Sequence, residues 1–391
     1  MNELERRLRD ALHATADTVD EYKERPLPTH TFRSRTPSRR LVPILTAVAV
    51  LILIAGALGI RHLLHDDPKP LRKPPVVPKY VVAAMPATKS RPSTLEVREI
   101  HGGRQVAAQR VADHRLAFTS VAGSGDGRTF FVVVSPRAAD SCSADVRRLT
   151  LAPSGAIEDL QPTGLSFPFS SIRDLAVSPD GKKIAYARSC TGGQNDMGSY
   201  DTAARTKTTW TVPASQYVSS LAWTPDGRSI AFALASPGIS RSMIGQLGDV
   251  SFDGPGGEAR LLDPGRSPQG DLRTHSTRLL TAPRDAGLTG VRISSDGRQG
   301  QVYAVYYIKR GIRGQETEYL AVGSKLITVS LVSGQQTSVI PIPGARGSDP
   351  AVLDGEASGR YLLTGAGVVD LRQGGRIERI AGLSGALDVS W

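Results

Sequence analysis

One motif recurs along most of this 391-residue chain and constrains its fold more than any other feature. Its clearest copies read LAVSPDGKKIAYA from Leu175 and LAWTPDGRSIAFA from Leu221. Looser copies begin at Val121, Val291 and Leu353. The turn glycines of the five copies lie 46 to 70 residues apart and are Gly127, Gly181, Gly227, Gly297 and Gly359. A period of this size, with strand-like rather than helical patterning, is typical of a propeller or a repeat array.

The turn inside the motif has a physical basis. Pro179 fixes φ at roughly −65°, Asp180 follows, and Gly181 adopts the left-handed conformation without steric cost. We expect a structural role for these turn residues, which are Pro179, Asp180, Gly181, Pro225, Asp226 and Gly227. In an alternative interpretation Asp180 and Asp226 are metal-binding or catalytic carboxylates. The turn explains better why an aspartate occupies the same place in every repeat.

Composition supports a chain of short strands. Glycine and proline number 40 and 26, a density that disfavours a helical bundle and favours strands joined by turns. The runs that follow the turns, such as IAYA from Ile184, are short and apolar. Such runs are expected for strands buried between two stacked sheets. The sequence therefore predicts an all-β fold.

The motif Ser/Thr-Pro-Asp-Gly-Lys/Arg followed by Ile-Ala-Tyr/Phe resembles the TolB-like, WD40-like propellers of bacteria. The resemblance covers residues 80–391. The whole layout is also similar to a group of membrane-anchored WD40-repeat-like proteins from high-GC Gram-positive bacteria, with LLDP at 261–264 and ALDVSW at 386–391 as matching segments. These resemblances imply an architecture and no particular activity.

The two ends of the repeat region complement one another. ALDVSW at 386–391 aligns with SSLAW at 219–223, which is an inner strand just before its turn. We expect the three missing partner strands near 80–84, 94–100 and 104–111. A blade built from both ends closes the ring and removes unpaired sheet edges. Five internal turns plus this blade predict a six-bladed β-propeller, with seven blades as the alternative if residues 236–290 contain another.

The segment before the propeller predicts a membrane anchor. Residues 41–60 carry no charge over a length that spans roughly 30 Å as a helix. The alternatives are a buried core helix or a cleaved signal peptide. We divide the chain into a cytoplasmic segment (1–40), a transmembrane helix with its flank (41–64), a proline-rich stalk (65–79) and an extracytoplasmic propeller (80–391). Basic residues flank the helix equally, so the orientation with a cytoplasmic N-terminus and an external propeller depends on the secreted-looking fold and its cysteines.

Residues 2–24 predict an amphipathic helix with an apolar stripe at Leu4, Leu8 and Leu12. The stripe can dock on a cytoplasmic partner or lie on the inner membrane surface. A solvated helix without a dedicated partner is the alternative.

Cys142 and Cys190 follow the second strands of neighbouring blades, so both are expected in loops on one face. Outside the cell such a pair can form a disulfide. Two free buried thiols are the alternative.

The longest predicted loops share that face and are candidates for ligand or partner binding. Their apolar candidates are Ile239, Met243, Ile244, Leu247 and Phe252, and their polar ones are Arg310, Arg313 and Tyr319. In the alternative interpretation these loops only cover the ends of the sheets.

Charge and motifs exclude several function classes. The net charge is +11, of which +8 lies in residues 66–391 and is spread over the repeats without a basic patch interleaved with aromatics, so we expect no nucleic-acid partner. Two cysteines exclude a zinc site of four thiolates. We find no Gly-x-Ser-x-Gly elbow, no His-Glu-x-x-His motif and no P-loop, and we expect no enzyme, no metal and no cofactor.

Together these features predict a non-catalytic binding or scaffold module at the cell envelope, with a protein or an envelope polymer as ligand. The alternative is a transmembrane signalling regulator, similar in outline to anti-sigma-type proteins, that relays outside binding through residues 2–24. An envelope hydrolase acting from the central cavity is the least favoured hypothesis.

Overall fold

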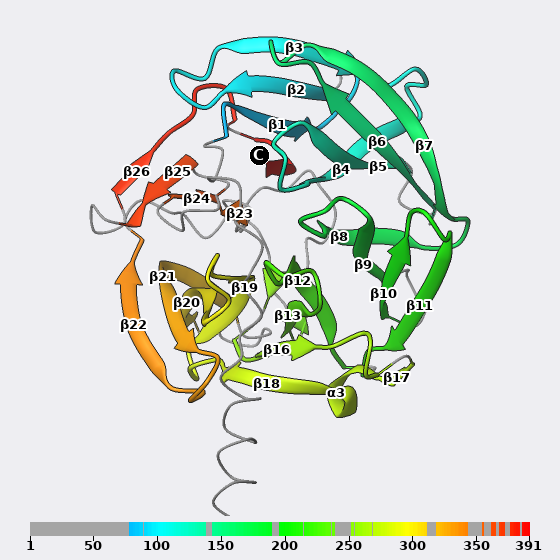
Figure 1. The fold of residues 1–391 in the computed structure, drawn as a ribbon. Coiled ribbons are helices and arrows are strands. Elements are labelled where there is room, and N and C mark those ends of the chain that lie inside the picture. The colour runs from blue at the N-terminus through cyan, green and yellow to red at the C-terminus, as the bar shows by residue number, and fades with distance from the viewer. Residues whose placement is uncertain are drawn as a thin grey trace, which may run out of the picture. The chain divides into compact units, whose positions relative to one another are not determined.

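Short antiparallel strands follow one another around a ring in the computed structural model (Figure 1). The structure describes residues 78–391 except 89, 138–142, 190–194, 214, 236, 239–251, 254, 268, 311–317, 343–353, 356–360, 365–366, 372–375 and 384. The predicted cytoplasmic helix, transmembrane helix and most of the stalk lie outside this part. No helix among the described residues is long and apolar enough to cross a membrane.

Six four-stranded units account for most of the described strands. The closing blade contains β27 (Asp388–Ser390), β1 (Tyr80–Met85), β2 (Thr94–Glu99) and β3 (Gln105–Arg110). Blade 1 contains β4 (Leu116–Gly123), β5 (Thr129–Pro136), β6 (Ala144–Leu151) and β7 (Ile157–Phe167). Blade 2 contains β8 (Ser171–Val177), β9 (Lys183–Ser189), β10 (Asp196–Asp201) and β11 (Thr206–Thr211).

The other three blades follow the same order. Blade 3 contains β12 (Tyr217–Trp223), β13 (Ile230–Ala235), β16 (Glu258–Leu262) and β18 (Ser276–Thr281). Blade 4 contains β19 (Ala286–Ile293), β20 (Gln299–Arg310), β21 (Glu318–Ser330) and β22 (Gln336–Pro341). Blade 5 contains β23 (Asp354–Gly355), β24 (Tyr361–Thr364), β25 (Gly367–Asp370) and β26 (Arg376–Glu378). The prediction of an all-β, six-bladed propeller is confirmed.

The predicted joining of the two ends is also confirmed. β27 pairs antiparallel with β1, with Val82 opposite Ser390 and Ala84 opposite Asp388. The N–H of Leu387 donates to the carbonyl oxygen of Ala84 at 2.8 Å and extends this pairing.

Residues 236–290 do not contain a seventh blade in their described part. β16 and β18 complete blade 3, while β14 (Pro237–Gly238) and β15 (Phe252–Asp253) form a separate two-stranded pair. β17 (Gly270–Asp271) instead pairs in parallel with β11 on the outer edge of blade 2. The helix α3 (Leu272–His275) follows and buries Leu272 completely.

In every described repeated turn the hydroxyl of the first residue donates to the aspartate two residues later, although in blade 1 the N–H of Thr129 donates to Asp126 and not to the Ser124 hydroxyl. In blade 2 the Ser178 hydroxyl donates to Asp180 at 2.6 Å, and the N–H of Lys183 donates to the Ser178 hydroxyl at 2.9 Å. Gly181 has φ of 71° and donates its N–H to the Ser178 carbonyl. Thr224 and Asp226 repeat this arrangement in blade 3. The aspartates therefore accept hydrogen bonds within their own turns, as do the corresponding Asp126 and Asp296.

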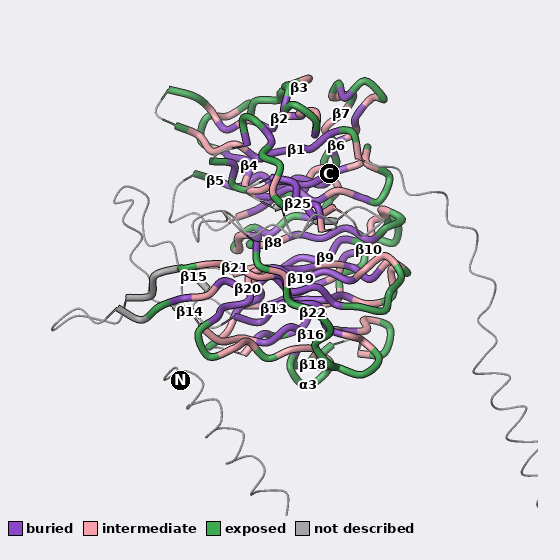
Figure 2. The backbone as a smooth tube through the Cα atoms, turned by 90° about the vertical axis from the view of Figure 1, so that its left-hand side faces the viewer, coloured by how far each residue is buried: buried purple, intermediate pink, exposed green. Residues whose placement is uncertain are grey.

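The core lies between successive blades, because each sheet packs its apolar face on the next. Figure 2 shows the inner strands mostly buried and the outer strands more exposed. All of β1 except Met85 is buried, for example, whereas β22 is almost entirely exposed. Between blades 1 and 2 the core includes the aromatic residues Phe131, Phe167, Tyr186 and Tyr200.

The inner strands contact one another through polar side chains. Four of them carry a β-bulge at the same place, centred on Thr119, Arg173, Ser219 and Thr289. The extra residue of the bulge changes the direction in which the next side chain points. Ser220 of blade 3 thus accepts the N–H of Val291 in blade 4 at 3.0 Å. Such bonds give a partner to backbone groups that the sheet pairing leaves free.

Candidate functional site

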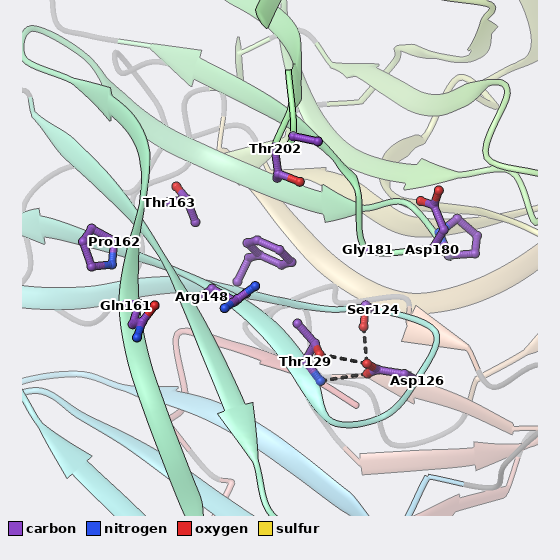
Figure 3. A pocket seen from close by; sticks show the side chains of 13 residues that line it. Ser124, Asp126, Thr129, Arg148, Gln161, Pro162, Thr163, Asp180, Gly181 and Thr202 are labelled. Carbon is purple, nitrogen blue, oxygen red and sulfur yellow. Dashed lines mark hydrogen bonds between the residues drawn. The ribbon is translucent and has the colours of Figure 1, made fainter. Parts of the chain in front are cut away.

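A polar pocket opens between blades 1 and 2 at the end of the propeller that carries the repeated turns (Figure 3). Its volume is about 430 Å³, within the range of small-molecule sites. The lining residues are Ser124, Asp126, Thr129, Phe131, Arg148, Gln161, Pro162, Thr163, Pro179, Asp180, Gly181, Thr202 and Ala203.

The wall from blade 1 is a row of three cross-strand neighbours. Phe131 on β5 pairs with Arg148 on β6, and Arg148 pairs with Gln161 on β7. Residues directly opposite in an antiparallel sheet place their side chains on the same face. Phe131 belongs to the core between the two blades, so its buried ring fixes the inner end of the row. Arg148 and Gln161 continue the row outward and are exposed.

The facing wall belongs to two turns of blade 2. Pro179, Asp180 and Gly181 come from the repeated turn, and Thr202 and Ala203 come from the turn between β10 and β11. The hydroxyl of Thr202 and its N–H both donate to the carbonyl oxygen of Lys182, each at 2.9 Å. The two turns therefore hold each other in place.

Asp126 lies at one end of the pocket in a closed network. The N–H groups of Arg128 and Thr129 donate to its Oδ1 at 2.7 Å, and the hydroxyls of Ser124 and Thr129 also donate to its carboxylate (Figure 3). Burial alone would raise the pKa of Asp126, but these hydrogen bonds outweigh it and hold the pKa below the ordinary carboxyl value. Asp126 is consequently ionised, and its carboxylate already accepts hydrogen bonds from its own turn.

Asp180 is ionised for a related reason. The hydroxyl of Ser178 donates to its Oδ1 and is the main cause of a lowered pKa, with the N–H of Lys182 as a further donor. Its side chain is exposed at the pocket.

Arg148 and Gln161 differ from these aspartates, because neither side chain has a hydrogen-bond partner among the described residues. Thr163 and Thr202, also in the lining, donate their hydroxyls to the backbone carbonyls of Val146 and Lys182. A guanidinium with five N–H donors and a side-chain amide thus remain free to bind a ligand.

The sequence carries a signal for Arg148, although the predicted binding residues do not include it. Arg148 pairs with the fourth residue after the turn glycine of its blade. The residues that pair in the same way on the third strands of blades 2, 3 and 4 are Ser199, Leu261 and Thr328. A charged residue at this place is particular to blade 1 among these four. Arg148 is exposed, so the signal is only that this place carries a charge in blade 1 and none in the other three.

The residues predicted for binding lie mostly outside the described part. This applies to Cys142, Cys190, Ile239, Met243, Ile244, Leu247 and Arg313. Phe252, Arg310 and Tyr319 lie on β15, β20 and β21, of which only the backbone is described at these positions. The described strands that flank these segments are the second and third strands of their blades, and the ends of those strands that face these segments lie opposite to the pocket.

Exposed apolar side chains do occur at that opposite end. Phe169 and Leu387 precede inner strands and are 81% and 45% exposed. Ile308 and Val322 lie on the outer parts of β20 and β21 and are 51% and 55% exposed. Among the described residues, no group of histidine, cysteine or acidic side chains could hold a metal ion.

Comparison with known proteins bears on the fold. No family model and no curated protein sequence matches the chain. Similar solved structures include TolB from Acinetobacter baumannii, with TM-score 0.44, 16% identity and coverage of 72% of this chain and 56% of that one. Another is Kuenenia stuttgartiensis hydrazine synthase, with TM-score 0.42, 13% identity and coverage of 74% and 75%. A structure from a study of two prolyl endopeptidases gives TM-score 0.43, 14% identity and coverage of 73% and 36%.

These comparisons correct one expectation. From missing motifs we predicted that the chain is not an enzyme, but two of the three similar structures belong to enzymes. The fold and the absent hydrolase motifs therefore do not exclude catalysis. TolB is among the structures of similar fold, and the chain itself is a six-bladed β-propeller.

Proposed function

We propose that this chain is a binding or scaffold module of the cell envelope, anchored in the membrane by residues 41–60, and that it binds its ligand in the pocket between blades 1 and 2. The observation that carries the proposal is the Arg148 guanidinium, which has no partner among the described residues and lines a pocket of about 430 Å³. An exposed charged side chain that makes no contact with the described residues is expected to add little to folding. Such a group is instead available for recognition.

Preorganisation of the walls supports this proposal. Asp126 is fixed by hydrogen bonds within its own turn, and the Thr202 hydroxyl is fixed by a hydrogen bond to Lys182 in the adjacent repeated turn. A ligand would therefore meet walls that need little reordering, which reduces the entropic cost of binding. The uncharged run at 41–60 and the proline-rich segment at 65–79 support anchoring and spacing from the membrane.

A photo-crosslinking residue placed at position 161 of the full chain, in its native cells, tests the proposal. Gln161 lies in the pocket and has no described partner to lose, so the replacement should leave the fold intact. The matched control carries the same residue in place of Arg110, an exposed side chain on the outer strand β3.

We expect a specific adduct from position 161 and none from position 110. The adduct should decrease when Arg148→Ala is combined with the crosslinker. No adduct from position 161, or equal adducts from both positions, would overturn the proposed site.

A further inference from the structure

The chemistry of the free groups in the pocket points to a ligand class, an inference that rests on the proposed function. Three groups have unused capacity. Arg148 offers N–H donors, Gln161 offers both a donor and an acceptor, and the Oδ2 of Asp180 accepts no hydrogen bond from any described residue. A matching ligand presents donors and acceptors close together.

The charges of the lining disfavour an ionic ligand. Asp126 and Asp180 are both ionised, and Arg148 opposes them. A free anion drawn to Arg148 would lie beside two carboxylates, while a cation drawn to the carboxylates would lie beside the guanidinium. Nearby charges of both signs cancel much of the attraction for any single charge. A neutral ligand avoids both penalties.

Apolar surface is also present on both sides. Pro162 on β7 and Pro179 in the repeated turn belong to opposite walls, and both are exposed. The edge of Phe131 closes the inner end. A ligand that is polar around its rim and carries C–H groups on its faces can use these surfaces together.

We infer that the pocket binds a neutral saccharide unit. Its hydroxyls would accept from Arg148, exchange hydrogen bonds with Gln161 and donate to Asp180, and its C–H faces would contact the two prolines. The mixed charge, the apolar walls and the free amide each favour this class over a simple anion or cation.

Titration of the full chain with three small sugars tests the inference. The chain is placed in phosphatidylcholine nanodiscs, so that no sugar-headed detergent competes, and binding is followed by ligand-observed NMR. The probes are N-acetylglucosamine, which is neutral, glucosamine, which is a cation, and glucuronate, which is an anion. We expect the neutral sugar to bind tightest.

Variants locate the binding. Arg148→Ala should weaken binding of the neutral sugar about tenfold, since a hydrogen bond to a charged group is lost. Arg148→Lys should also weaken it, because the planar fork of donors is replaced by a point charge. Gln161→Ala should weaken it less, and Arg110→Ala, the matched arginine on β3, should leave it unchanged.

Three results would overturn the inference. They are tighter binding of glucuronate or glucosamine than of N-acetylglucosamine, no binding of any of the three, and an equal loss in Arg110→Ala and Arg148→Ala. A crosslinked adduct at position 161 together with absent sugar binding would reject the saccharide class while the proposed binding function stands. Absence of both would reject the two together.

Discussion

Two seams on either side of blade 1 differ in the polar contacts of the side chains that face them. At the closing seam, between the closing blade and blade 1, Asp388 accepts from the Ser120 hydroxyl at 2.6 Å and from the Val121 N–H at 2.9 Å. Ser390 accepts from the N–H of Gly123 at 2.7 Å. At the pocket seam, between blades 1 and 2, Arg148 and Gln161 form no such bonds with the described residues.

The difference follows from what else holds each seam. The strand β27 contributes only three residues, and the partners that its side chains bind are far away in sequence, as the 268-residue separation of Ser120 and Asp388 shows. Closing so long a loop is entropically unfavourable, so specific polar contacts are concentrated there. Both seams have an apolar core, with Tyr80, Phe118 and Phe130 at the closing seam and Phe131, Phe167 and Tyr186 at the pocket seam. At the pocket seam the exposed Arg148 and Gln161 lie outside this core, so we expect them to contribute little to stability.

The largest expected effect comes from removing the carboxylate at the closing seam. Asp388→Ala leaves the Val121 N–H and the Ser120 hydroxyl without their acceptor, and we expect a loss of about 3 kcal/mol in the free energy of unfolding. Thermal unfolding of the full chain measures it. Asp388→Asn retains an acceptor oxygen and should lose clearly less. Equal losses in both variants would show that the acceptor is not what matters.

A smaller loss is expected from Gly123→Ala. A Cβ at this position would overlap the backbone oxygen of Trp391 and crowd the Ser390 hydroxyl, so the end of β27 would have to shift. We expect a destabilisation of about 1–3 kcal/mol, the usual cost of overpacking. The control Gly323→Ala adds a Cβ that meets nothing within 4 Å. If both variants unfold at the same denaturant concentration, the closing seam is looser than these contacts indicate.

The third prediction concerns Asp174, on the inner strand β8. Burial raises its pKa well above the ordinary carboxyl value, and the nearby Asp388 adds to the shift, although the N–H groups of Leu175 and Leu221 oppose it. The folded state therefore binds the proton more tightly than the unfolded state. The contribution of Asp174 to stability is therefore fully present below the ordinary carboxyl pKa and is lost as pH rises from there through the raised native pKa.

Asp174→Asn does not titrate and keeps an acceptor oxygen for the two N–H groups. We expect it to be more stable than the natural chain at neutral pH, with a difference that shrinks as pH falls below the ordinary carboxyl pKa. Denaturant unfolding at a series of pH values measures this difference. A variant that is less stable at neutral pH would contradict the assigned cause.

The smallest expected effect is at the pocket seam. Arg148→Ala removes an exposed side chain that has no partner among the described residues, so the free energy of unfolding should change by no more than about 0.5 kcal/mol. Chemical denaturation of the full chain checks it, and Arg110→Ala provides the reference. A loss above about 1 kcal/mol would mean that Arg148 supports the fold, and the contrast between the two seams would disappear.

The sequence allowed prediction of the ring but not of the pocket. Turns such as Ser178 to Lys183 are local, so their residue types alone specify them, and the pairing of β1 with β27 followed from matching the ends. The pocket depends on cross-strand register, which places Phe131, Arg148 and Gln161 side by side although they are far apart in sequence. Asp388 reaches Ser120 and Val121 because of the β-bulge at Thr119 in blade 1. No local sequence pattern predicts that bulge.

The strand β17 has a consequence for how the outer rim behaves. It comes from the connection between β16 and β18 of blade 3, yet it covers the edge of blade 2, and nearby Trp210 donates its indole N–H to the carbonyl oxygen of Ser267 at 2.7 Å. Leu272 from the same connection packs in the core with Trp210. The connection from blade 3 therefore holds the outer edge of blade 2. The outer strand of blade 2 has no free edge at this place for pairing with another chain. We also expect blades 2 and 3 to unfold locally together and not one at a time.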